Sequence, residues 1–139
     1  MRNGVICFFV VAAVFEMSGC SKQPKLWKAK GQVVKNGEDF IPEDEENLQI
    51  ALVPIQENLS PAKNWYYAEV DQAKGTFFAA GGEKKGVPPG KYRVLVELKK
   101  DKKDVLKGKF FNLESTFVFE IDDRSETMIV DIGTSPAKT

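Results

Sequence analysis

The covalent chemistry open to this chain is narrow, and it centres on Cys20. The 139 residues include two cysteines and no histidine, so the commonest general base and the commonest metal ligand are absent. Cys7 lies inside an apolar run, whereas Cys20 directly follows Met17-Ser18-Gly19, where apolar sequence gives way to polar sequence. A thiol at such a boundary is a nucleophile that could accept a lipid group.

The segment before Cys20 has the composition of a secretory signal peptide. Arg2 supplies one positive charge, residues 5–15 are all apolar, and Ser18-Gly19 are small. The apolar run is shorter than the ~20 residues that a membrane-spanning helix needs. We therefore expect residues 1–19 to be cleaved. The alternative is a buried element of the fold, which the even spread of Phe and Val over every face disfavours.

Residues 17–20 resemble the bacterial lipobox, in which a diacylglycerol is attached to the cysteine thiol and cleavage makes that cysteine the first residue. The resemblance implies fatty acyl chains on Cys20, and two or more chains anchor a protein stably to a membrane. Met17 replaces the more common leucine, and Glu16 is an unusual charge just upstream. The competing interpretation is ordinary secretion, with Cys20 free or disulfide-bonded.

The mature chain is expected to run from Cys20 to Thr139 without a disulfide, because Cys7 would be removed and Cys20 acylated. Residues 20–26 would be the lipidated cysteine and a short tether, residues 27–133 one domain, and residues 134–139 a polar tail. Twenty basic residues balance twenty acidic ones, so no nucleic-acid partner is expected. Ser21 implies, by the sorting rule of other Gram-negative bacteria, the periplasmic face of the outer membrane.

The remaining polar groups do not predict a catalytic or metal site. No Gly-x-Ser-x-Gly motif is present. Adjacent carboxylates such as Asp122 and Asp123 would point to opposite faces of a strand, and a turn is the simpler interpretation. The acidic stretch 43–46 lacks EF-hand spacing and is expected to be a solvated loop. We therefore expect no enzyme activity, no metal and no cofactor.

Two aromatic residues are the candidates for ligand binding. Trp65 and Tyr67 share one face of an expected strand, and Tyr66 and Ala68 share the other. If Tyr66 and Ala68 face the core, Trp65 and Tyr67 form an exposed pair that could stack on sugar rings. In the alternative interpretation both rings are buried.

The elements that must position these residues are strands. Apolar alternation is clearest over residues 91–99, where Tyr92, Val94, Val96 and Leu98 share a face, and it is typical of a half-buried antiparallel strand. About seven such segments predict an all-β, seven-stranded antiparallel β-sandwich. They span residues 26–37, 48–55, 65–71, 76–80, 91–99, 115–122 and 126–133. Residues 99–112 are expected to be a charged loop.

Three motifs, taken in order, resemble the carboxypeptidase regulatory-like domain, a transthyretin-like (prealbumin-like) sandwich. The first is Gly31, Val33 and Gly37 followed by Ile41-Pro42. The second is the Asp71, Gly75 and Phe77 turn, with one extra residue, and the third is Pro89-Gly90 with Tyr92. Together with the lipobox, this order is similar to small lipoproteins of planctomycete-type bacteria. The resemblance implies a fold, and its turn and core motifs imply no activity.

The expected function is therefore a non-catalytic module, lipid-anchored at the cell envelope. The first hypothesis is a protein-interaction or structural role, because a sandwich with available edge strands can pair with a partner. The alternative is a carbohydrate-binding module that uses Trp65 and Tyr67. The expected partners are thus the membrane, through Cys20, and an envelope protein or polysaccharide.

Overall fold

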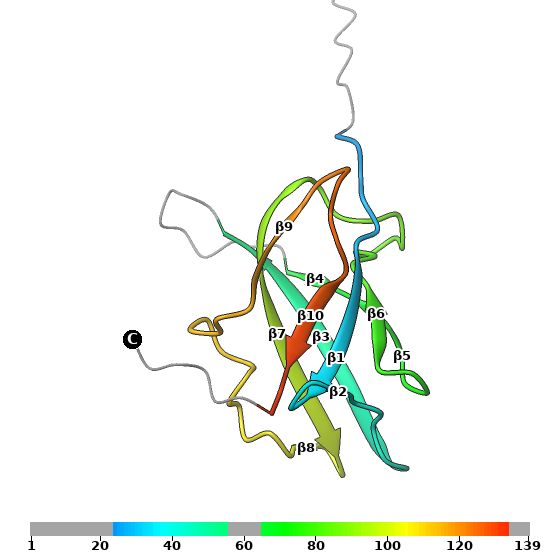
Figure 1. Ribbon diagram of the computed structural model, residues 1–139, viewed down its shortest axis with the longest axis vertical. Helices are drawn as coiled ribbons and strands as arrows, with labels where there is room; N and C mark the ends of the chain where they lie inside the picture. The colour runs from blue at the N-terminus through cyan, green and yellow to red at the C-terminus, as the bar shows by residue number, and fades with distance from the viewer. Residues whose placement is uncertain (1–23, 56–64, 134–139) are drawn as a thin grey trace, which may run out of the picture.

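The computed structural model describes residues 24–55 and 65–133, which form strands and connecting loops without a helix (Figure 1). Ten strand segments make two five-stranded sheets. The first sheet holds β1 (Lys30–Lys35), β2 (Glu38–Asp39), β5 (Glu69–Asp71), β6 (Thr76–Phe78) and β10 (Met128–Asp131). The second holds β3 (Glu46–Pro54), β4 (Tyr66–Tyr67), β7 (Gly90–Lys100), β8 (Lys103–Asp104) and β9 (Val118–Ile121).

The predicted all-β chain with two packed sheets is confirmed, whereas the predicted count of seven strands is not. The count is higher because the expected strand 65–71 is divided into β4 and β5, and because the two-residue strands β2 and β8 form outside the expected strands. The signal peptide, Cys20 and the polar tail lie outside the described residues.

One core lies between the sheets. β3 and β7 pair antiparallel from Glu46 opposite Lys100 to Pro54 opposite Tyr92, and they form the centre of the second sheet. Alternate residues of both strands face the first sheet and are fully or almost fully buried, as the alternation predicts. These residues are Leu48, Ile50, Leu52, Tyr92, Val94, Val96 and Leu98.

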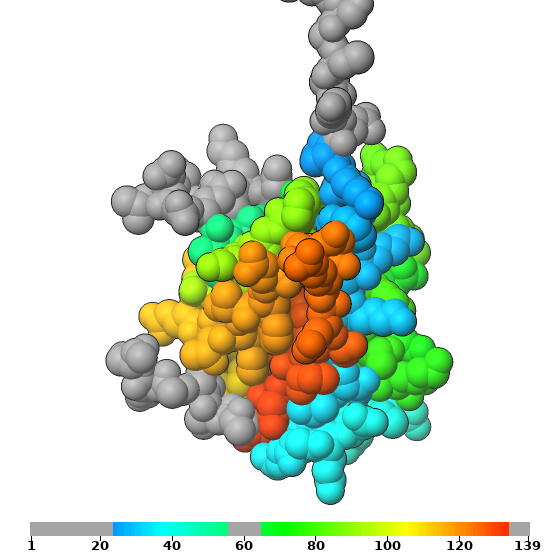
Figure 2. All heavy atoms as spheres, turned by 45° about the horizontal axis from the view of Figure 1, so that its top comes forward, coloured from blue at the N-terminus to red at the C-terminus, as the bar shows by residue number. Residues whose placement is uncertain are grey.

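The pairing of β10 corrects the expectation of an antiparallel fold throughout. β10 runs parallel to β1, with Gly31 opposite Met128 and Val34 opposite Asp131. The two strands lie side by side although they come from opposite ends of the described chain (Figure 2). Period-two alternation identifies the residues that face inward, but it carries no information about the direction of the neighbouring strand.

The expected strand 65–71 is divided between the sheets. β4 pairs with β3 and β5 pairs with β6, and the chain crosses over at Ala68. The Ala68 amide still donates to the Ile50 carbonyl at 2.9 Å. Tyr66, Ala68 and Val70 all pack against the core, because both sheets share it. The alternation therefore continues through the crossing and hides it from sequence analysis.

Residues 99–112 are only partly the charged loop that we expected. Phe110 is 1% exposed and belongs to the main core, and its carbonyl accepts from the Val96 amide at 3.0 Å. Phe111 lies over the outer face of the second sheet and covers a small cluster of Ala51, Val53 and Leu95. The outer face of the second sheet is thus partly buried, whereas the sequence pattern predicted strands buried on one face only.

Candidate functional site

Trp65 and Tyr67 lie on the outer face of the second sheet. Tyr67 is opposite Ala51 in the β3–β4 pair, and its side chain is 58% exposed. Trp65 is 38% exposed, and its ring meets the ring of Phe111 edge-on, with the centroids 6.0 Å apart. Trp65 is therefore partly engaged in packing, and Tyr67 is the more open of the two aromatic surfaces.

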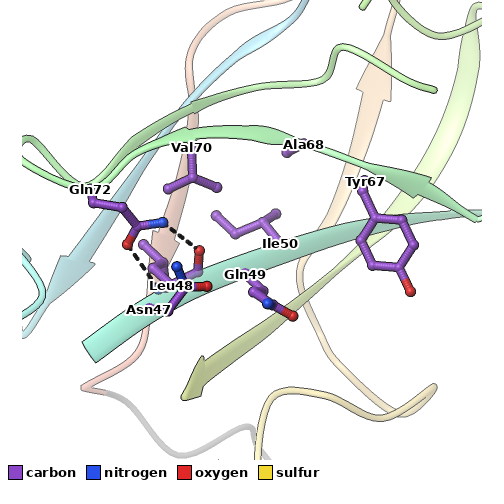
Figure 3. Close-up of a pocket in the computed structure, with 8 residues that line it drawn as sticks. All are labelled: Asn47, Leu48, Gln49, Ile50, Tyr67, Ala68, Val70 and Gln72. Carbon is purple, nitrogen blue, oxygen red and sulfur yellow. Dashed lines mark hydrogen bonds between the residues drawn. The ribbon is translucent and has the colours of Figure 1, made fainter. Parts of the chain in front are cut away.

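A cavity of about 310 Å³ lies next to Tyr67, along the edge of β3 (Figure 3). It forms where β4 ends and the chain turns away toward the first sheet, so that this part of β3, which pairs with β7 on one edge, has no neighbouring strand on its other edge. Its lining residues are Asn47, Leu48, Gln49, Ile50, Tyr67, Ala68, Val70 and Gln72. Sequence analysis did not find this cavity, because it depends on the crossing at Ala68.

The Gln72 side chain makes the hydrogen bonds to Leu48 that a neighbouring strand would otherwise make. The Leu48 amide donates to Gln72 Oε1, and Gln72 Nε2 donates to the Leu48 carbonyl, both at 2.8 Å (Figure 3). A carboxamide carries an acceptor and a donor side by side, as a peptide group does, so it can satisfy both backbone groups of one residue. The polar edge of β3 is thereby satisfied next to the cavity.

A second set of polar contacts near the cavity involves Gln49. Lys99 Nζ donates to Gln49 Oε1 at 3.1 Å, and the same ammonium lies 3.1 Å from a Glu97 carboxylate oxygen. Gln49 lines the cavity, and the exposed Asn47 lies two residues away on the same face of β3. Among the described residues that line it, the cavity therefore has carboxamides and no carboxylate.

This combination of groups suits a neutral polar ligand. An aromatic ring offers an apolar face and, in tyrosine, a hydroxyl group. Carboxamides both donate and accept hydrogen bonds without the desolvation cost of a charge. The cavity volume is at the lower end of the range, about 300–1,000 Å³, that is typical of small-ligand sites.

Asp122, one of the adjacent carboxylates considered above, has a structural role. Asp122 begins a turn, in which its Oδ1 accepts from the Arg124 amide at 2.8 Å and its own amide donates to Ser125 Oγ at 2.6 Å. In the described ranges, no group of three or more Cys, Asp or Glu side chains is placed to hold a metal ion. The Ser115 hydroxyl is buried and donates to the Val94 carbonyl at 2.9 Å.

Two Ser-x-x-Lys spacings lie outside the described residues, at Ser60 with Lys63 and at Ser135 with Lys138. This spacing occurs in β-lactamases and penicillin-binding proteins together with Ser-Asp-Asn and Lys-Thr-Gly motifs. The chain contains neither accompanying motif. The two spacings therefore do not by themselves indicate acyl-transfer chemistry.

No family model, curated protein or solved structure matches the chain. Within the described part, no helix has the length and apolar character needed to cross a bilayer.

Proposed function

We propose that this chain is a bacterial lipoprotein, anchored through Cys20, whose non-catalytic β-sandwich binds a carbohydrate of the cell envelope at Tyr67 and Trp65. The observation that carries the proposal is the exposed Tyr67 ring beside a cavity lined by the carboxamides of Asn47, Gln49 and Gln72. A sugar ring would stack on Tyr67, and its hydroxyl groups would exchange hydrogen bonds with the carboxamides.

A titration with envelope polysaccharides and defined oligosaccharides tests this proposal. The chain has two tryptophans, so a Trp27→Phe background leaves Trp65 as the only tryptophan reporter. We expect saturable quenching or a spectral shift for a bound glycan, and loss of binding in Tyr67→Ala. Phe78→Ala is a matched control, because Phe78 is as exposed as Trp65, at 38%, but lies in the first sheet. Binding that survives Tyr67→Ala would contradict the proposal.

A second candidate function is the protein-interaction or structural role. It is favoured by Leu113 and Val118, which are 48% and 44% exposed. Val118 is opposite Arg93 in the β7–β9 pair, and the Leu113 carbonyl accepts from the Arg93 guanidinium. Arg93 donates to the Leu113 carbonyl, its Nε is buried without a partner, and it forms no ion pair within the described part of the chain. A partner carrying a carboxylate in an apolar setting would complement this surface.

A crosslinking pull-down from the native envelope separates the two candidates. Recurrent recovery of one protein, lost in Val118→Asp and kept in Tyr67→Ala, would favour the interaction module. Polysaccharide without protein, lost in Tyr67→Ala and kept in Val118→Asp, would favour the carbohydrate module.

We also propose that the sandwich is a carboxypeptidase regulatory-like domain. Two motifs of the resemblance have the local geometry that their residue types suggest. Gly75 has a φ of 63° and closes the β5–β6 turn by donating to the Asp71 carbonyl at 2.9 Å. Tyr92 is buried, and its hydroxyl donates to the Pro88 carbonyl at 2.6 Å. A determined structure with the same strand connections would test the assignment.

Localisation at the periplasmic face of the outer membrane is part of the proposal and rests on Ser21. Separating the inner and outer membranes of the native cells and detecting the chain in each fraction tests it. We expect the outer-membrane fraction to contain the wild-type chain and Ser21→Asp to move it to the inner membrane. Wild-type chain in the inner membrane would contradict this localisation.

A further inference from the structure

We infer that the Tyr67 cavity selects sugars that carry an acetamido group, that is, N-acetylated hexosamines, over sugars that carry only hydroxyls. The inference rests on the proposed carbohydrate-binding function and names the sugar class. It follows from the orientation of two carboxamides, each of which is determined by a partner whose hydrogen-bonding role is unambiguous.

Lys99 determines the orientation of Gln49. An ammonium group has donors only, so the Gln49 atom that faces it at 3.1 Å must be the acceptor Oε1. The Gln49 amino group then points away from Lys99 and keeps both of its N–H donors for a ligand. Glu97, 3.1 Å from Lys99 Nζ and with a side chain only 18% exposed, holds the ammonium in place.

Leu48 determines the orientation of Gln72 in the same way. The backbone amide of Leu48 can only donate and its carbonyl can only accept, so Gln72 Nε2 faces the carbonyl. One Nε2 hydrogen is used there, and the second is left on a residue that lines the cavity. Gln49 and Gln72 thus both line the cavity and both keep an N–H donor that is not used in these contacts.

The lining between these donors is apolar. Ile50, Ala68 and Val70 contribute to the cavity and also pack against the main core, so their positions are well determined. An acetamido group has a carbonyl oxygen that accepts two hydrogen bonds and a methyl group that packs on apolar surface. A hydroxyl at the same sugar position supplies neither the carbonyl nor the methyl group. None of the described lining residues carries a carboxylate, so a sugar amine would find no counter-charge among them.

Isothermal titration of the lipidated mature chain, in a detergent without a sugar headgroup, tests the inference. The probes are triacetylchitotriose and cellotriose, which have the same linkage and differ at the acetamido group. We expect the acetylated trisaccharide to bind at least about tenfold more tightly, since two additional hydrogen bonds are formed. Gln49→Glu keeps the contact to Lys99 but removes the donors, and it should reduce the preference to within about threefold.

Lys99→Met tests the positioning role separately. Without the ammonium, the Gln49 carboxamide can present either end to the ligand, so the ratio of the two affinities should fall while the wild-type fold remains. Lys103→Met is the matched control, because Lys103 is an exposed lysine in β8, away from the cavity lining, and the ratio should not change.

The outcomes distinguish the inference from the function on which it rests. Equal binding of the two trisaccharides would overturn acetamido selection and leave carbohydrate binding intact. Binding of neither, together with no response to envelope polysaccharide, would contradict the carbohydrate function itself. A preference that persists in both Gln49→Glu and Lys99→Met would overturn the assignment to Gln49.

Discussion

Gly31 in β1 lies directly against the ring of Phe77, and the two residues are opposite each other in the β1–β6 pair. A β-carbon at Gly31 would overlap atoms of that ring, which is itself fully buried. We therefore expect Gly31→Ala to lower the free energy of unfolding by about 1–3 kcal/mol through overpacking. Urea unfolding followed by circular dichroism measures this change.

Gly82 provides the control for this substitution. A β-carbon at Gly82 would have no neighbour within 4 Å, and the residue has no positive φ. Gly82→Ala should leave the unfolding midpoint unchanged or raise it slightly, because it reduces the conformational entropy of the unfolded chain. If Gly31→Ala is as stable as Gly82→Ala, the close contact with Phe77 does not constrain this position.

Tyr92 links stability to alkaline pH. Burial, with a smaller contribution from the nearby Tyr66, raises the pKa of Tyr92 to about 12. The folded chain thus keeps this proton to higher pH than the unfolded chain, in which a tyrosine loses it near a pKa of about 10. The Tyr92 contribution to stability is complete below about pH 10 and is lost as the pH rises toward about 12.

The Tyr92→Phe variant tests this linkage. It should lose about 0.5–1.5 kcal/mol at neutral pH, because the hydrogen bond to Pro88 is removed. It should also lose less stability than the wild type between about pH 10 and 11, as measured by urea midpoints at each pH. Tyr67→Phe, at an exposed ring, is the control. Parallel pH curves for Tyr92→Phe and the wild type would contradict the assignment to Tyr92.

At the scale of elements, the β3 edge depends on Gln72. Gln72→Ala removes both hydrogen bonds to the backbone of Leu48, a residue that is only 1% exposed. We expect a loss of about 1–3 kcal/mol in unfolding free energy, because a buried donor and acceptor are left without partners. The Leu48 amide should also exchange its hydrogen faster. Asn47→Ala, at an exposed carboxamide on the same strand, should change neither quantity, and unchanged Leu48 exchange in Gln72→Ala would refute the role of Gln72.

Elements that depend on a local residue pattern were predictable from the sequence. Elements that depend on contacts between distant parts of the chain were not. Leu48, Ile50 and Leu52 alternate in the sequence and face the core as expected. The Asn36-Gly37 turn forms with positive φ at both residues, as its residue types indicate. These features involve residues close together in the chain, and so short-range sequence patterns report them.

The crossing at Ala68 and the burial of Phe110 involve distant parts of the chain. Residues 65–71 alternate without a break, although β4 and β5 belong to different sheets. Phe110 follows a lysine-rich stretch that is typical of a solvated loop, but its ring stacks on Phe117 with the centroids 5.7 Å apart. The sequence therefore indicated the exposed aromatic pair of the candidate site, while the cavity and its carboxamides required the structure.

At the scale of the whole molecule, the proposed anchor lies close to the fold. Within residues 24–55 and 65–133, the first backbone contact that ties the chain to the sandwich is at Trp27, whose amide and carbonyl bond to Val87 at 2.8 and 2.9 Å. Six residues lie between Cys20 and Trp27, so the seven Cα–Cα steps from the acylated cysteine to the sandwich span at most about 25 Å. A lipidated chain would therefore hold the Trp27 end of the sandwich within that distance of the membrane surface.

Substitution of each cysteine tests the anchor, because the lipoprotein proposal requires Cys20 and does not require Cys7. Cys20→Ala removes the thiol that would carry the diacylglycerol, so the variant should lose fatty-acid label and move from the detergent phase to the aqueous phase in a Triton X-114 separation. Cys7→Ala alters only the segment expected to be cleaved, so that variant should keep both the label and its detergent partitioning. Because the chain has only these two thiols, label retained in Cys20→Ala would mean that lipid is attached elsewhere and that the chain is not anchored as we propose.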